Sequence, residues 1–197
     1  MDYDGTLRRY WPEFDSRLGH LFSQHFYIIF YALDYCDFMD QITLVNRRSI
    51  QSLVTVDEEA QHQAGKIFSK KEKKEELKKR FDEGYETFYA YKKNKEIVAY
   101  ATFKPFFPGH KHCEIYWLNV KKNYQGQGIG TKLITHIEKL AKKKGFRKVC
   151  VYTGKNMKKT RAFYEKNKYL FVNEFKEYYG FPTGNKTAVL YAKNLIK

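Results

Sequence analysis

The segment covering residues 125–131 combines three glycines with the start of a helical pattern, and this combination could bind phosphate. Gly126, Gly128 and Gly130 lack a Cβ atom, so a ligand can approach their backbone closely. Backbone N–H groups at a helix start point toward one concavity, where the helix dipole adds positive potential. The segment therefore predicts a site for a phosphate-bearing ligand, with an ordinary flexible turn as the alternative.

The spacing of these glycines excludes two common phosphate motifs. Counted from Gly126, the dinucleotide pattern G-x-G-x-x-G and the P-loop pattern G-x-x-x-x-G-K-[ST] both require glycine at position 131, which is Thr131. The pattern that fits is Q-x-x-G-x-G, formed by Gln125, Gly128 and Gly130.

A strand and a helix are expected to position this loop. Residues 114–120 are strongly β-forming, and an apolar face at helical spacing follows over residues 129–144. Residues 87–91 and 97–104 predict a hairpin. Further expected elements are a strand at 50–56, a helix beginning at Asp57, a charge-dense helix at 66–80, strands at 149–153, 169–172 and 187–192, and a short helix at 158–166. This order predicts a mixed α/β sheet with helices on its faces.

The strand–loop–helix unit resembles the pyrophosphate-binding segment of the GNAT acetyltransferase superfamily. The frame V-x(4)-Q-G-Q-G-I-G agrees with it, and the residues 160–172, TRAFYEKNKYLFV, resemble the family segment that carries a tyrosine beside the CoA sulfur. Tyr164 matches that tyrosine, and Asn156 matches a loop asparagine that contacts CoA, although it lies eight residues before Tyr164 rather than the commoner seven. The resemblance covers about residues 86–175 and implies an α+β domain with a mixed, mostly antiparallel sheet.

The resemblance also implies the reaction, which is direct attack of a primary amine on acetyl-CoA. The amine would belong to a protein, a peptide or a small molecule. Glu114, at the start of the strand leading to the loop, is the candidate base, and an exposed strand-edge carboxylate is its alternative. Tyr164 is the candidate hydrogen-bond donor to the leaving thiolate, and a packed aromatic is its alternative. His110 and His112 are further candidate bases.

The cofactor is expected to bind along the strand end and the loop. The resemblance implies that backbone groups of Leu118 and Val120 pair with the pantetheine arm, as the family does where two parallel strands separate. Strand alternation places Glu114, Tyr116, Leu118 and Val120 on one side of the sheet. The expected cofactor-binding residues are Leu118, Asn119, Val120, Gln125, Gly126, Gln127, Gly128, Ile129, Gly130, Thr131, Asn156 and Tyr164. No metal is expected, and an acyl-cysteine at Cys113 or Cys150 is disfavoured because neither has a histidine base nearby in the sequence.

Composition leaves a second function class open. The formal net charge of +15 over 197 residues favours anionic partners, so an inactive GNAT-fold module that binds CoA or nucleic acid is the alternative to an enzyme. The three cysteines form no CxxC pair, and the most apolar stretch, residues 26–33, is too short to span a bilayer. A cytoplasmic protein without membrane contact is therefore expected.

The chain is expected to have two parts. Residues 1–45 form an aromatic-rich, helical extension that packs on the domain or serves as a lid or dimer surface, and residues 46–197 form the acetyltransferase domain. A homodimer remains open.

Overall fold

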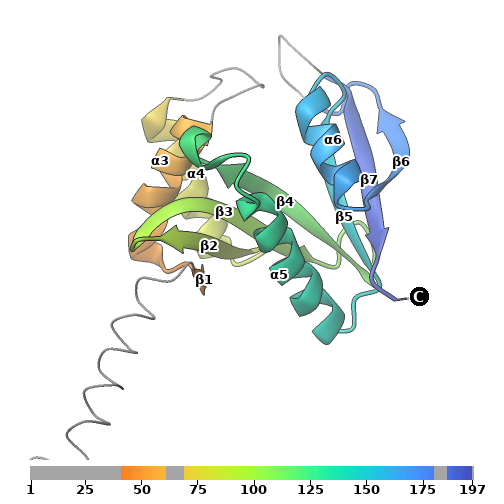
Figure 1. Ribbon diagram of the computed structural model, residues 1–197, viewed down its shortest axis with the longest axis horizontal. Helices are drawn as coiled ribbons and strands as arrows, with labels where there is room; N and C mark the ends of the chain where they lie inside the picture. Colours follow the sequence, from red (N-terminus) through yellow and green to blue (C-terminus); the bar gives the residue numbers. More distant parts are fainter. Residues whose placement is uncertain (1–40, 61–68, 180–185, 197) are drawn as a thin grey trace, which may run out of the picture. The chain divides into compact units, whose positions relative to one another are not determined.

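Seven strands form one sheet in the computed structural model, which describes residues 41–60, 69–179 and 186–196 (Figure 1). The order across the sheet is β1-β2-β3-β4-β5-β7-β6. The strands are β1 (Gln41–Leu44), β2 (Thr87–Lys93), β3 (Glu96–Pro105), β4 (His112–Val120), β5 (Lys148–Gly154), β6 (Leu170–Phe175) and β7 (Ala188–Asn194). Every neighbouring pair is antiparallel except β4 and β5, which are parallel, so the predicted mixed, mostly antiparallel sheet is confirmed.

The chain divides into two units, residues 1–39 and 40–197, and the sheet belongs to the second. β1 pairs with β2 although it falls within the range 1–45 that was expected to be a helical extension. The helix and the lid or dimer role expected for residues 1–40 lie outside the described residues.

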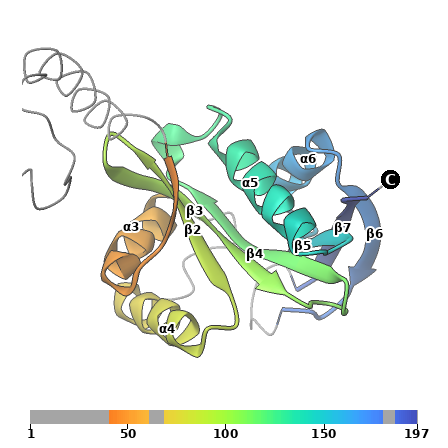
Figure 2. The same cartoon turned by 90° about the horizontal axis from the view of Figure 1, so that it is seen from below.

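Two helices, α3 (Ile50–Ala60) and α4 (Lys70–Glu83), cover one face of the sheet (Figure 2). The strand predicted at residues 50–56 and the helix start predicted at Asp57 are both wrong. The buried residues of α3 include Ile50, Leu53, Val54 and Asp57, which recur at helical spacing, so the β-branched residues here form a helix face. The charge-dense helix is present as α4, which begins at Ser69 with a capping box and ends at Gly84 in the left-handed conformation.

The opposite face of the sheet carries α5 (Ile129–Lys143), and α6 (Lys158–Lys166) packs beside the strands that follow. Both helices confirm the predictions of a helix at residues 129–144 and a short helix at residues 158–166. α5 buries Ile129, Leu133, Ile134, Ile137 and Ala141. The 3₁₀ turn η3 (Lys122–Tyr124) leads from β4 toward this helix.

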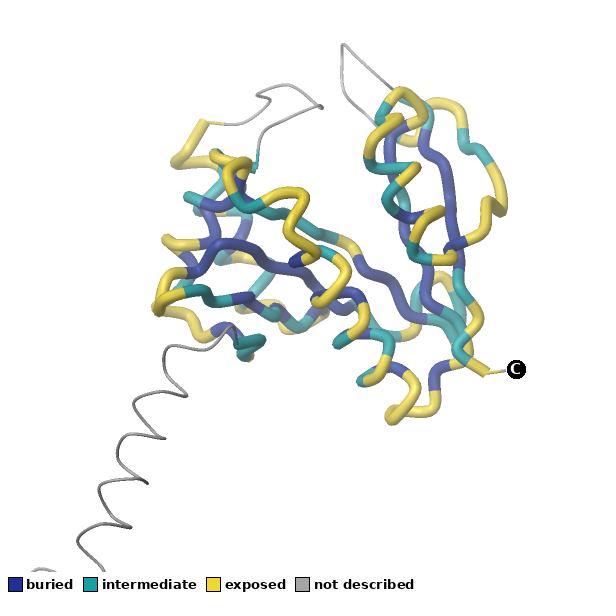
Figure 3. Tube along the Cα trace, viewed as in Figure 1, coloured by how far each residue is buried: buried dark blue, intermediate teal, exposed yellow. Residues whose placement is uncertain are grey.

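The core has two main parts, one on each face of the sheet. One lies beneath α5 and α6, and the other lies between the sheet and the helices α3 and α4. Buried residues follow the central strands and the inner faces of the helices (Figure 3). Within the described ranges, no helix has the length and apolar character needed to cross a bilayer.

Candidate active site

The parallel strands β4 and β5 separate after a short paired segment (Figure 1). They pair only from His112 with Lys148 to Glu114 with Cys150. Beyond Glu114, the part of β4 that ends at Val120 has no strand partner on this side among the described residues. Backbone groups at this open edge are available to an extended ligand, as in strand addition.

A β-bulge follows directly in β4. In the pairing with β3, Ala101 lies opposite Leu118 and Phe103 lies opposite Ile115, so one residue of β3 faces two residues of β4. The extra residue is accommodated where Trp117 donates its backbone N–H to Thr102 Oγ1 at 3.1 Å.

The bulge makes the predicted side-chain alternation wrong. Leu118 and Val120 pack against the core beneath α5, on the face of the sheet that Ile115 also occupies. Glu114 pairs opposite Lys104 and therefore lies on the other face, which it shares with Asn119. An inserted residue reverses the alternation beyond it, and the sequence pattern alone gives no sign of the insertion.

Glu114 is a buried carboxylate, only 1% exposed, and its Oε2 atom has no hydrogen-bond partner among the described residues. Burial raises the pKa of Glu114 to about 7, against a lowering by Lys104, a further rise from Glu86 and a lowering by Arg80. The exposed carboxylate considered as the alternative is therefore not what the structure shows. A carboxylate with a pKa near neutrality can take up a proton under physiological conditions.

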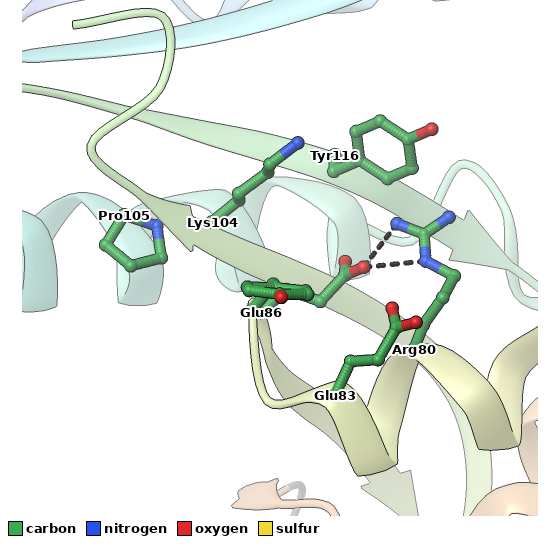
Figure 4. A pocket seen from close by; sticks show the side chains of 7 residues that line it. Arg80, Glu83, Glu86, Lys104, Pro105 and Tyr116 are labelled. Atoms are coloured by element: carbon green, nitrogen blue, oxygen red, sulfur yellow. Dashed lines mark hydrogen bonds and ion pairs between the residues drawn. The ribbon is translucent and has the colours of Figure 1, made fainter.

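A pocket of about 290 Å³ is lined by Lys104, the cross-strand neighbour of Glu114, and by residues around it (Figure 4). Arg80 crosses it from α4, donates through Nε to Glu86 Oε1 at 2.7 Å, and stacks 4.1 Å from the ring centroid of Tyr116. This pocket was not predicted, because its residues come from separate elements. The residues that line it are Arg80, Glu83, Tyr85, Glu86, Lys104, Pro105 and Tyr116; we call it the Arg80 pocket.

The loop before α5 has the conformation that its glycines permit. Gly126 and Gly128 have φ angles of +76° and +78°, and nothing lies within 4 Å of the position where a Cβ would be. The first i→i−4 helix bond runs from Lys132 N to Gly128 O at 3.0 Å. The amides of Ile129, Gly130 and Thr131 in the first helical turn consequently have no intrahelical acceptor.

The two glutamines of the loop are held by the protein itself. Gln125 donates through Nε2 to Val120 O at 2.9 Å and to Ala60 O at 3.2 Å, which ties the loop to the ends of β4 and α3. Gln127 donates to Asn123 O at 3.1 Å and accepts from Lys93 Nζ at 3.0 Å. Their side chains therefore shape the loop.

Gly130 has a packing role that the motif does not reveal. A Cβ at this position would lie 3.1 Å from the ring of Phe163, so the missing side chain lets α6 approach α5 closely. The third glycine thus differs from Gly126 and Gly128, which face open space.

Tyr164 lies on α6 and is 5% exposed. Its ring packs against Tyr169 and Tyr191, with centroids 5.6 and 6.4 Å away. Burial, the neighbouring Tyr179 and the Glu114 carboxylate hold the pKa of Tyr164 well above its usual value, so its hydroxyl stays protonated at neutral pH. Asn156 is exposed in the turn between β5 and α6, where its carbonyl accepts from Lys158 N at 2.9 Å.

Asn119 belongs to a network that the sequence did not reveal. Its side-chain amide donates to Asp57 Oδ1 at 2.6 Å, and Tyr100 donates to the same oxygen at 2.6 Å. Lys73 Nζ lies 3.2 Å from Asp57 Oδ2. Because the Asn119 side chain is hydrogen-bonded to Asp57 of α3, only the backbone of Asn119 is available to a ligand along β4.

The other candidate nucleophiles and bases have structural surroundings. Cys113 and Cys150 are both buried, and burial raises the pKa of their thiols to about 12 and about 11. His110 stacks on Phe106 in the turn between β3 and β4, and His112 is the first paired residue of β4.

Comparison with known proteins places this geometry in a family. The family described as "Acetyltransferase (GNAT) family" matches residues 53–169, which is more than half of the chain. A comparison with proteins of curated function found no match.

Solved structures share the fold at low sequence identity. An N-acetyltransferase from Staphylococcus aureus has a TM-score of 0.66 at 14% identity, over 80% of this chain and 99% of that one. The ribosomal-protein-S18-alanine N-acetyltransferase from Escherichia coli has a TM-score of 0.64 at 17% identity, over 80% and 94% of the two chains. The PaiA N-acetyltransferase from Thermoplasma acidophilum, solved with coenzyme A, has a TM-score of 0.62 at 20% identity, over 79% and 99%.

The family match covers the separating strands, the glycine loop and α6. The chain belongs to the GNAT acetyltransferase family, whose members use acetyl-CoA.

Proposed function

We propose that the protein transfers an acetyl group from acetyl-CoA to the nitrogen of a primary amine by direct attack. The observation that carries this proposal is Glu114, a buried carboxylate without a hydrogen-bond partner for Oε2, at the point where β4 leaves β5. A buried polar group without a partner is costly, and groups of this kind are characteristic of functional sites.

The residues of the loop and of β4 fit acetyl-CoA. The amides of Gly128, Ile129, Gly130 and Thr131 would hold the pyrophosphate, since a helix N-terminus favours anions and the two left-handed glycines leave open space around it. The open edge of β4 at Leu118 and Val120 would pair with the pantetheine arm. Acetyl-CoA, when bound, supplies a thioester carbonyl that an amine can attack.

Glu114 would accept the proton of the attacking amine, directly or through one water molecule. A lysine-like amine has a pKa of about 10.4 and is protonated at neutral pH, so a proton must be removed before or during attack. A carboxylate with a pKa of about 7 is a stronger base than an ordinary glutamate and is still largely ionised at slightly alkaline pH.

Tyr164 would donate a hydrogen bond or its proton to the departing sulfur. Its raised pKa keeps the hydroxyl protonated, as a donor requires. Thus the proposed base lies on β4 and the proposed donor on α6.

The test combines thiol release with mass spectrometry of the acceptor. Purified protein is mixed with acetyl-CoA and a panel of primary amines, and the free thiol and the acetylated product are both quantified. We expect thiol release that depends on the amine, with one acetyl group on its nitrogen. Calorimetric binding of acetyl-CoA without transfer to any amine in the panel would contradict the proposal and favour a binding module.

A further inference from the structure

Lys104 is a cation of the Arg80 pocket that has no anionic partner within the described ranges. The other charged groups of the pocket are paired: Arg80 with Glu86, and Glu83 with Lys79, whose Nζ lies 3.9 Å from Glu83 Oε1. Lys104 is therefore the charged side chain of the pocket lining that makes no hydrogen bond or ion pair within the described part of the chain.

Lys104 is also the cross-strand partner of Glu114. The two residues lie directly opposite each other on β3 and β4, so their Cβ atoms are about 4.5–5.5 Å apart. The two side chains form no ion pair. Instead, Lys104 Nζ lies 4.2 Å from the ring centroid of Phe107. It also lies 5.2 Å from the ring centroid of Tyr116, whose side chain Figure 4 shows with that of Lys104.

We propose that the acceptor is a small amine that carries a carboxylate a few bonds from its reacting nitrogen, with Lys104 binding the carboxylate and Glu114 receiving the amine. This inference rests on the proposed function and names the substrate class of that site. The carboxylate could belong to a free amino acid or to the first side chain of a peptide.

Charge balance during the reaction supports this pairing. Glu114 becomes neutral when it takes the proton of the amine, so Lys104 loses the negative charge of the carboxylate directly opposite it. A carboxylate on the acceptor compensates the positive charge of Lys104 throughout the reaction, and ion pairs of this kind are strengthened where water is partly excluded.

The dimensions agree with a small acceptor. A volume of about 290 Å³ lies at the lower end of ligand pockets, which usually span about 300–1,000 Å³. Because Lys104 and Glu114 are directly opposite, the amine and the carboxylate that they bind must also be close together.

A purely positional role for Lys104 makes a different prediction. Lys104 lowers the pKa of Glu114. In a purely positional role, removal of Lys104 would change the rate only by changing the pKa of the base. In that case every acceptor would be affected equally, whether or not it carries a carboxylate.

The experiment compares acceptors in matched pairs. Glycine, β-alanine and 4-aminobutyrate are each measured against the corresponding amide, and a peptide amide that begins with Asp is measured against the same peptide that begins with Asn. We expect at least one carboxylate compound to exceed its partner in kcat/KM by about 10- to 100-fold, the worth of one charged hydrogen bond. The free and peptide pairs distinguish the two sources of the carboxylate.

Variants then test whether Lys104 causes the preference for carboxylate acceptors over their amides. Lys104→Met should reduce it to near unity by lowering kcat/KM for the acids far more than for the amides, and Lys104→Arg should retain it. Lys139→Met removes an exposed lysine from α5 on the opposite face of the sheet and should change nothing. A preference that survives Lys104→Met, or an equal loss for both members of each pair, would overturn the inference.

A binding measurement gives a second readout that does not need turnover. Calorimetry should detect binding of the N-acetylated form of the preferred acid to the wild-type protein in the presence of CoA. Its affinity for Lys104→Met should be lower by about tenfold or more. Equal kcat/KM for acids and amides in the wild type would refute this inference and leave the proposed function standing. Absence of transfer to every acceptor would refute both.

Discussion

The loop before α5 and the Arg80 pocket are built in different ways. The loop is a single stretch of chain, and its expected chemistry belongs to backbone amides that two left-handed glycines expose. The pocket is assembled from α4, the segment before β2, and the strands β3 and β4, and its chemistry belongs to side chains. A local backbone site depends on a few residue types in order, whereas a site of converging side chains depends on the register of the whole sheet.

The two regions also differ in the kind of free-energy cost that they impose on the folded protein. In the loop the cost is conformational, since a residue other than glycine at a φ near +78° is strained. Beside the pocket the cost is electrostatic, since Glu114 is buried without a full set of hydrogen bonds. Substitutions in the two regions should therefore change different measured quantities: acetyl-CoA affinity for the loop, and kcat and stability for Glu114.

The largest effect is expected on the side-chain region. Glu114→Gln keeps the shape of the residue but cannot accept a proton, so kcat should fall by about 10²–10⁴-fold in the thiol-release assay. Glu75→Gln, an exposed carboxylate of α4, is the matched control and should retain wild-type kcat. An active Glu114→Gln enzyme would place the base elsewhere.

The same substitution should make the protein more stable at alkaline pH. The pKa of Glu114 is about 7 in the folded chain and about 4.5 when unfolded, so the folded state binds the proton more tightly and loses stability as the pH rises between these values. Glu114→Gln should therefore gain about 2–3 kcal/mol in urea denaturation at pH 8.

This gain should vanish below a pH of about 4.5, where the glutamate is protonated in both states. A variant that is no more stable than the wild type at pH 8 would show that the ionised carboxylate has partners in the folded protein.

The backbone region should respond in affinity. Gly128→Val forces a β-branched residue into the left-handed region, at a cost of about 1–3 kcal/mol, so the loop should relax and bind acetyl-CoA about 10- to 100-fold more weakly by calorimetry. Gly145→Val is the matched control, because Gly145 has a φ of +82° beyond the other end of α5. It should lose similar stability with acetyl-CoA affinity intact, and equal losses of affinity in the two variants would remove the special role of the loop.

The smallest effect is expected at Tyr164. Tyr164→Phe preserves the packed ring and removes the donor, so kcat should fall about tenfold with KM for acetyl-CoA nearly unchanged. Tyr169→Phe is the control, since it removes a buried hydroxyl that donates to Glu138 at 3.0 Å. That variant should lose stability but keep kcat, and the reverse pattern would make Tyr164 a packing residue.

The same contrast explains what could be predicted from the sequence. The strand before the loop and the helix after it follow from local patterns over residues 114–144, whereas the positive φ angles of Gly126 and Gly128 were not predicted. The strand predicted at residues 50–56 is a helix, because its buried residues Ile50, Leu53, Val54 and Asp57 lie at three- and four-residue spacing and form one helix face.

The rest of the site depends on long-range structure. The bulge opposite Thr102 reverses the alternation of β4, and no residue type marks it. Lys104 becomes the partner of Glu114 only through the register of β3 with β4. Gly130 fits the motif, but its contact with Phe163 appears only when α6 packs on α5.

The pH dependence of kcat/KM tests the role of Glu114 most directly, since this parameter reports the ionisations of the free enzyme. It should be measured with one amine acceptor for the wild type and for Glu114→Gln. The titratable groups that interact electrostatically with Glu114 are Lys104 on β3, Arg80 on α4, Glu86 before β2, Cys150 and Tyr152 on β5, Tyr164 on α6, and Tyr178 and Tyr179 after β6.

For the wild type, kcat/KM should rise with pH through an inflection at about 7, because only the ionised carboxylate accepts a proton. Glu114→Gln should lose that inflection together with most of the rate. An inflection near 7 that persists in Glu114→Gln, at a rate close to that of the wild type, would contradict Glu114 as the base.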